Sequence, residues 1–77
     1  MGKTVPLKKF RKYLKSLGLK HIRDNDSHEL WDFPDKPLLR PVTVDMNIPD
    51  VPITHIHTNL KTLGINMKQF KEDIKNI

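Results

Sequence analysis

The sequence contains no cysteine, which excludes a disulfide framework and a thiolate metal site. It has no apolar run that approaches the roughly 20 residues of a membrane-spanning helix, so we expect no membrane partner. The N-terminal residues lack the apolar stretch of a secretory signal peptide, which predicts a cytoplasmic location. A chain of 77 residues has room for one domain, residues 1–77, and a core this small benefits from a binding partner.

Acidic side chains are absent from the first third of the chain. Residues 1–23 carry eight basic side chains and no acid, whereas residues 24–50 carry seven acids, and the net charge is +5. A basic segment of this kind favours a polyanionic partner, of which nucleic acid is the commonest. The alternative is a solvated helix face whose charge is balanced by the acidic segment.

The spacing of apolar residues predicts an amphipathic helix over residues 5–17. Thr4 is its expected N-cap, and Gly18 is expected just beyond its C-terminus, where a positive φ costs glycine little. The face of this helix opposite the apolar stripe is basic, and it is formed by Lys8, Arg11, Lys12 and Lys15.

Residues 19–23 and 27–33 are predicted as the two strands of a β-hairpin, joined by acidic and amide turn formers. Simple alternation places His21 and Arg23 on the same face of the first strand. In the second strand, the aromatic ring of Trp31 favours burial of its side under the preceding helix.

Residues 34–40 form a loop punctuated by prolines, and residues 41–45 alternate as a third strand. After a second proline-rich break, residues 53–63 are predicted as a helix that ends at Gly64. Asn66 is the expected cap of a last helix. The predicted order is α-β-β-β-α-α, which places the chain in the α+β class.

The chemistry of the chain points to its histidines, because no Gly-rich phosphate loop, paired-carboxylate motif or Ser-His-Asp arrangement is present. His55 and His57 point apart on a helix, so we expect polar surface positions there and no metal site. His28 lies at the mouth of the hairpin and is the candidate for proton transfer, since histidine titrates near neutral pH. RNA cleavage by internal attack of a 2′-hydroxyl needs one group to accept a proton and another to donate one, and imidazole suits either role. A surface or capping role for His28 is the alternative.

The segment from Gly18 to His28 resembles the motif of the HicA family of toxin-type RNA endonucleases. In that family a glycine, an apolar or aromatic residue and an arginine precede a Gly-Ser-His triplet. The resemblance extends to the basic helix, to a third strand at residues 42–44 and to residues 57–65, which end in Gly-Ile. The residues that match the motif are Gly18, Leu19, Arg23, Ser27 and His28, with Asp26 at the position of the triplet's glycine.

This resemblance implies a fold like that of double-stranded RNA-binding domains, with helices packed on one face of a three-stranded antiparallel sheet. It implies ribosome-independent cleavage of mRNA by His28 as general acid or base, without a metal or other cofactor. It also implies a small HicB-type antitoxin as protein partner. The residues expected to hold RNA are Lys8, Arg11, Lys12, Lys15, Lys20, Arg23 and Ser27, with Arg23 near the scissile phosphate.

The aspartate at position 26 supports an alternative, because a carboxylate repels RNA phosphates. On this reading the chain is a catalytically silent RNA-binding module of the same fold. A third possibility is a purely protein-binding domain, whose basic helix docks on an acidic partner. Salt-sensitive binding of RNA separates the second reading from the third.

Overall fold

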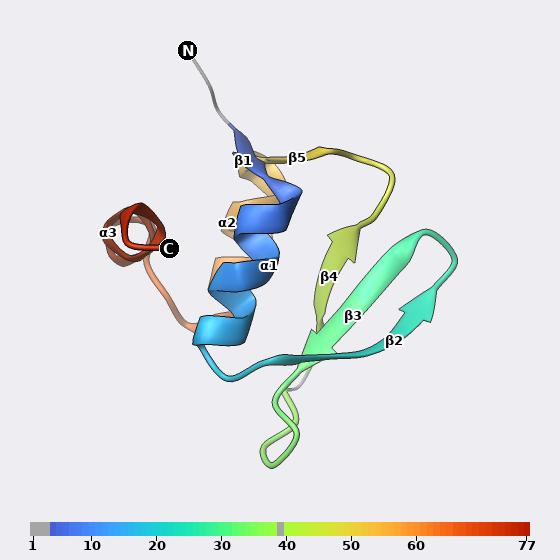
Figure 1. Ribbon diagram of the computed structural model, residues 1–77. Coiled ribbons are helices and arrows are strands. Elements are labelled where there is room, and N and C mark those ends of the chain that lie inside the picture. Colours follow the sequence, from blue (N-terminus) through green and yellow to red (C-terminus); the bar gives the residue numbers. More distant parts are fainter. Residues whose placement is uncertain (1–3, 39) are drawn as a thin grey trace.

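The computed structural model describes residues 4–38 and 40–77. Its three-stranded antiparallel sheet has the strand order β2 (Lys20–Asn25), β3 (His28–Asp32), β4 (Val42–Asp45) (Figure 1). A separate two-stranded sheet pairs β1 (Thr4–Pro6) with β5 (Asp50–Pro52). The predicted α-β-β-β-α-α order is confirmed, and the short strands β1 and β5 are additional. The helices are α1 (Leu7–Ser16), which follows β1, and α2 (Ile53–Leu63) and α3 (Met67–Lys75), which follow β5.

The N-terminus of α1 differs from its prediction. Thr4 does not cap the helix, because it belongs to β1, where it pairs with Pro52. The helix instead begins at Leu7, whose amide donates a hydrogen bond to the carbonyl of Pro49 at 2.9 Å. The periodicity assigned residues 5 and 6 to the first turn of this helix. They are extended instead, because they pair with a segment more than 40 residues away in the sequence.

The C-terminus of α1 is as predicted. Gly18 has a φ of +98°, and its amide donates to the carbonyl of Lys15. The next amide, of Leu19, donates to the carbonyl of Leu14 at 3.1 Å, which completes the Schellman pattern of bonds. Asn66 likewise caps α3 as predicted, because its side-chain oxygen accepts from the amide of Gln69. These local signals end α1 and begin α3 at defined residues.

A β-bulge in β2 changes the face on which its residues lie. His21 pairs with Trp31, but Arg23 pairs with Leu30, so Ile22 is the extra residue between the two pairs. Cross-strand partners share a face, and His21 and Arg23 therefore lie on opposite faces of the sheet. The prediction that these two residues share a face is wrong, because simple alternation does not allow for an inserted residue.

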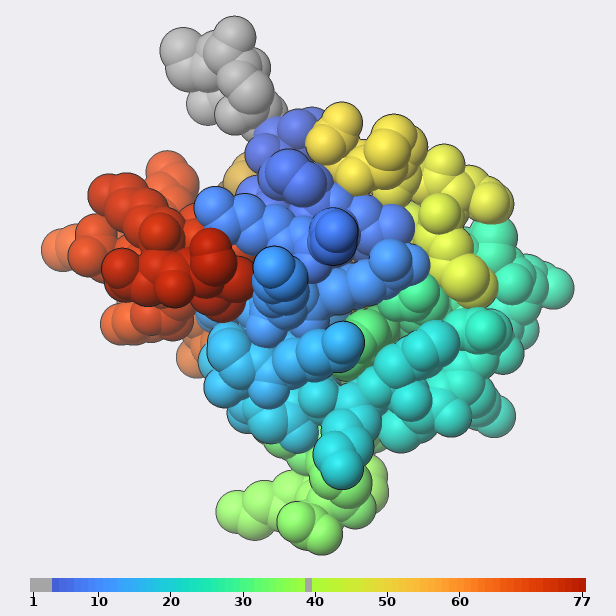
Figure 2. Space-filling view, in the orientation of Figure 1, coloured from blue at the N-terminus to red at the C-terminus, as the bar shows by residue number. Residues whose placement is uncertain are grey.

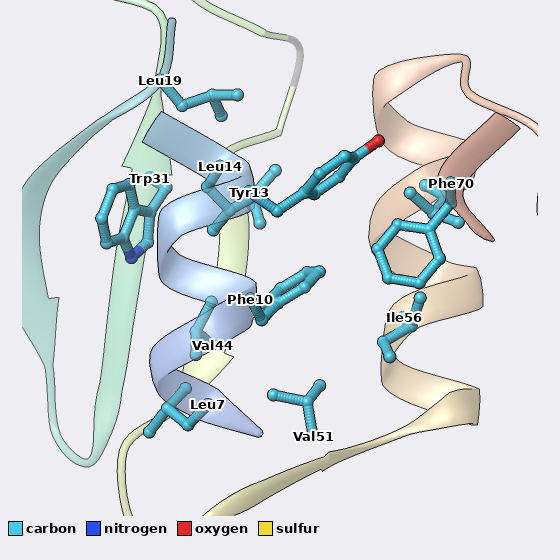
Figure 3. Close-up of a cluster of buried hydrophobic side chains, with 12 residues drawn as sticks. Leu7, Phe10, Tyr13, Leu14, Leu19, Trp31, Val44, Val51, Ile56 and Phe70 are labelled. Atoms are coloured by element: carbon cyan, nitrogen blue, oxygen red, sulfur yellow. The ribbon is translucent and has the colours of Figure 1, made fainter. Parts of the chain in front are cut away.

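The two faces of the sheet have different neighbours. The helix face carries Trp31, Val42 and Val44, and these side chains form one core with buried residues of α1, α2 and α3 (Figure 3). The predicted burial of Trp31 is confirmed, since it is 2% exposed. We call the opposite face, which carries His28 and Leu30, the groove face.

Among the described residues, no helix has the length and apolar character required to cross a membrane.

Helix α3 joins the core through its one buried aromatic side chain. The ring of Phe70 lies edge-on to the rings of Tyr13 and Phe10, with centroid separations of 4.9 and 6.3 Å (Figure 3). Phe70 is 2% exposed, whereas its neighbours along the helix are exposed. The surface view shows α1 between α3 on one side and the β2–β3 hairpin on the other (Figure 2).

Candidate functional site

The hairpin turn fixes the position of His28. Asn25 pairs with His28, so the loop between the strands consists of Asp26 and Ser27 alone. Asp26 has a φ of +56°, the left-handed conformation that glycine adopts freely and that aspartate tolerates better than most residues. Asp26 stands where the motif that residues 18–28 resemble has its glycine, and the left-handed φ is a conformation to which glycine is suited.

The turn conformation leads to a stability prediction. Asp26→Gly is expected to leave the free energy of unfolding within about 0.5 kcal/mol of the wild type, since relief of the left-handed φ offsets the greater freedom of glycine in the unfolded chain. Asp26→Val is expected to lose about 1–2 kcal/mol, because a β-branched side chain does not fit that φ. Urea unfolding measures both, with Asp35→Val in an exposed loop as the control. Equal stability of the two Asp26 variants would show that the turn does not need a left-handed residue.

Three strands bring polar side chains together on the groove face. His28 lies between Asn25 of β2 and Asp45 of β4, its direct cross-strand partners. Leu30, two residues further along β3, lies between Arg23 and Thr43 in the same way. Arg23 is therefore diagonal to His28, at a separation of about 7–8 Å that a long side chain spans. The bulge in β2 is what brings Arg23 to this face.

Helix α2 forms the second wall of a groove over these residues. The amide group of Asn59 accepts from the backbone N–H of Thr43 at 3.3 Å and donates to its carbonyl at 2.9 Å, as a neighbouring strand would. Asn59 is 6% exposed, so these bonds close the edge of β4 inside the protein. The resulting groove has a volume of about 500 Å³ and is lined by His28, Leu30, Arg40, Pro41, Thr43, Asp45, His55, Thr58, Asn59 and Thr62.

Two lining residues were not expected from the sequence as parts of a site. His55 was expected to be a polar surface position on its helix, and Arg40 was expected only in a loop. The available signal was the spacing of polar residues on α2: positions 55, 58, 59 and 62 recur at intervals of 3, 1 and 3, which places them on one helix face. That face has no apolar residue, yet it lies against β4 through Asn59.

The residues expected to hold RNA are divided between the two sides of the sheet. Arg23 and Lys20 lie on the groove face by their pairing with Leu30 and Asp32. The lysines of α1 are on the other side, because α1 packs against the helix face. Lys8, Lys12 and Lys15 are exposed there. The sheet therefore separates His28 from the basic surface of α1.

Arg11 differs from the lysines of α1 because its guanidinium is bonded to a buried carboxylate. Its Nε and Nη2 atoms donate to the two oxygens of Glu29, at 3.1 and 2.5 Å. Trp31 Nε1 also donates to Glu29, at 3.0 Å. Burial raises the pKa of Glu29, but the hydrogen bonds from Arg11 and Trp31 and the nearby positive charges outweigh it, so the pKa lies below its ordinary value. This arrangement ties α1 to the helix face of the sheet.

Ser27 contributes its backbone to the turn. Its carbonyl accepts a hydrogen bond from the amide of Met46 at 2.8 Å, which fixes the hairpin end against the residue after β4.

Across residues 4–38 and 40–77, no cluster of three or more histidine or acidic side chains has an arrangement that would hold a metal ion. The polar groups that line the groove are imidazole, guanidinium, carboxylate, amide and hydroxyl groups.

Comparisons with protein-family models, with curated proteins and with solved structures find no match for this chain. The resemblance of residues 18–28 to the HicA motif stays a prediction. The functional argument consequently depends on the groove and on the groups that line it.

Proposed function

We propose that this chain is a HicA-like endoribonuclease that cleaves mRNA in the cytoplasm without the ribosome, on a fold like that of double-stranded RNA-binding domains. The observation that carries the proposal is the position of His28. A turn with a left-handed residue presents this imidazole on an open groove face, and a bulge brings Arg23 to the same face. The same residues make the resemblance to the family motif.

In this reaction His28 acts as the general acid or base and Arg23 neutralises charge on the scissile phosphate. The 2′-hydroxyl attacks the adjacent phosphorus, and proton transfer alone is sufficient, so no metal or cofactor is required. Lys20 and Ser27 bind flanking phosphates near the hairpin. Lys8, Lys12 and Lys15 bind more distant phosphates on the other side of the sheet, while Arg11 supports this surface through its ion pair with Glu29.

A HicB-type antitoxin is the proposed protein partner. By covering the groove, such a partner would keep RNA away from His28. The groove is open, and its rim includes the exposed side chains of Arg40 and His55. A protein that binds there with an acidic surface would meet the guanidinium of Arg40 as a complementary charge.

The test is controlled expression of the wild type, His28→Ala and His57→Ala in a bacterium, with growth and mRNA integrity as readouts. We expect the wild type and His57→Ala to arrest growth and fragment mRNA. We expect His28→Ala to lose at least about 100-fold in the cleavage rate of purified protein, as is usual when a general acid or base is removed. Circular dichroism checks that this variant is folded. Growth arrest by folded His28→Ala would contradict the role of His28.

The second candidate is an RNA-binding module without cleavage. It is favoured by the two carboxylates near His28, those of Asp26 in the turn and of Asp45 in the adjacent strand. If wild type and His28→Ala are both harmless, an RNA-binding constant whose logarithm falls linearly with the logarithm of the salt concentration supports this reading. If the protein shows no salt-sensitive binding of RNA, the result supports a protein-binding domain instead.

A further inference from the structure

The groove contains a second histidine, on a different element from the first. His28 reaches it from β3 and His55 reaches it from the N-terminal half of α2. Arg40 and Asp45 are the other charged side chains that line it. The carboxylate of Asp45 accepts a hydrogen bond from the backbone amide of Asn47, in the turn that follows β4.

Two histidines matter because RNA transesterification moves two protons. One proton leaves the 2′-hydroxyl as the bond from its oxygen to phosphorus forms. Another must reach the 5′-oxygen as its bond to phosphorus breaks, giving a 2′,3′-cyclic phosphate and a 5′-hydroxyl. A single imidazole next to the 2′-hydroxyl leaves the departing oxygen to take its proton from water. A second imidazole on the opposite wall of the groove removes that deficiency.

We propose that His55 is the second proton-transfer residue, so that His28 and His55 together supply the general base and the general acid. This inference rests on the proposed ribonuclease function and extends it to a residue of α2. The scissile phosphate lies between the two walls of the groove. Arg40, on the rim, provides a positive charge for the additional negative charge that develops on the phosphate oxygens.

Helix α2 also provides a matched control. His57 lies two residues after His55 and is also exposed, but it lines a separate hollow with Lys61 and Met67 on another side of the helix. Removal of either imidazole takes the same group from an exposed position on the same helix. Any difference between His55→Ala and His57→Ala therefore reports on the groove.

The experiment measures cleavage of a short RNA by wild type, His28→Ala, His55→Ala and His57→Ala over a range of pH. We expect His55→Ala to lose at least about 100-fold in kcat with little change in KM, and His57→Ala to match the wild type. The wild type is expected to show a bell-shaped pH profile, because one imidazole must be neutral and the other protonated. His55→Ala should lose one limb of that bell.

A substrate with sulfur in place of the bridging 5′-oxygen then assigns the roles, since a thiolate leaves without a proton. This substrate should restore the rate of whichever histidine variant lacks the general acid. Rescue of either His55→Ala or His28→Ala, together with a lost limb in each variant, supports the pair. Retention of rate and of both limbs by His55→Ala overturns the inference. A loss of rate with both limbs kept and no rescue overturns it too, because His55 would then only position other groups.

The experiment distinguishes an error in the role of His55 from an error in the proposed ribonuclease function. If the wild type cleaves RNA, His28→Ala does not, and His55→Ala behaves as His57→Ala does, the ribonuclease proposal stands and only the role of His55 is overturned. If the wild type leaves RNA intact under all conditions, both proposals are overturned together.

Discussion

Arg11→Met is expected to lower the free energy of unfolding by about 3 kcal/mol at neutral pH, because it leaves the carboxylate of Glu29 buried without a counter-charge. The Glu29 side chain is 7% exposed, whereas that of Arg11 is 35% exposed, so we expect a loss at the low end of the range for buried pairs. Urea unfolding measures the loss. Lys12→Met, which removes an exposed charge from the same helix, is the control and should change stability little.

The loss should depend on pH in a direction that the ion pair determines. In the wild type the pKa of Glu29 lies below its ordinary value of 4.5. The group therefore stabilises the fold above that value, and this contribution is lost as the pH falls through the folded-state pKa. In Arg11→Met, burial dominates and we expect the pKa of Glu29 to be raised. The variant should then recover stability relative to wild type as the solution is acidified and the carboxyl becomes neutral.

A double variant separates the charge from the packing. Arg11→Met with Glu29→Gln removes both charges but keeps an oxygen that can accept the hydrogen bond of Trp31. We expect it to recover most of the stability lost by Arg11→Met alone, as buried ion pairs often tolerate neutral replacement. If the double variant is no more stable than the single one, the loss comes from the packing of the Arg11 side chain and not from the unpaired charge.

Phe70→Ala is expected to cost about 3–5 kcal/mol, the usual range for removing a buried aromatic ring. The ring is the one fully buried side chain by which α3 contacts Phe10 and Tyr13. A domain of this size has a total stability of about 4–12 kcal/mol, so the variant loses a large fraction of it. Chemical denaturation gives the size of the loss.

Hydrogen exchange shows where the Phe70→Ala change acts. If α3 detaches while the sheet stays folded, only the amides of α3 lose protection. Ile77→Ala is the matched control, since this residue lies just beyond α3 and is 37% exposed. Its stability should be close to that of the wild type. A Phe70→Ala protein as stable as Ile77→Ala would mean that α3 is not held by its aromatic contacts.

The parts of the fold that the sequence predicts are those encoded locally. Apolar spacing identifies α1, glycine ends it at position 18, and an asparagine at position 66 begins α3. The pairing of Val5 with Val51 is not encoded in this way, because each segment is too short for a strand pattern and the two lie far apart in sequence. The residues predicted to form the first turn of α1 are therefore extended in the structure.

In the candidate site, too, some features are encoded by neighbouring residues and others depend on contacts between distant segments. His28 and its turn follow from neighbouring residues, including the left-handed position at Asp26. Arg23 reaches the groove face only because of the bulge, and an inserted residue leaves no mark on the alternation. His55 joins the groove because Asn59 docks α2 on β4, a contact between segments 16 residues apart that periodicity alone does not reveal.

The bulge at Ile22 has a further consequence for how copies of this protein behave in solution. The strand that contains it, β2, is the outer strand of its sheet, and Ile22 is 50% exposed. An uninterrupted outer strand would offer a template on which a second molecule could add its own strand and begin aggregation. The inserted residue breaks the regular ladder, which disfavours the addition of a second strand at this edge. The irregularity that places Arg23 on the groove face thus also interrupts the exposed edge of the sheet.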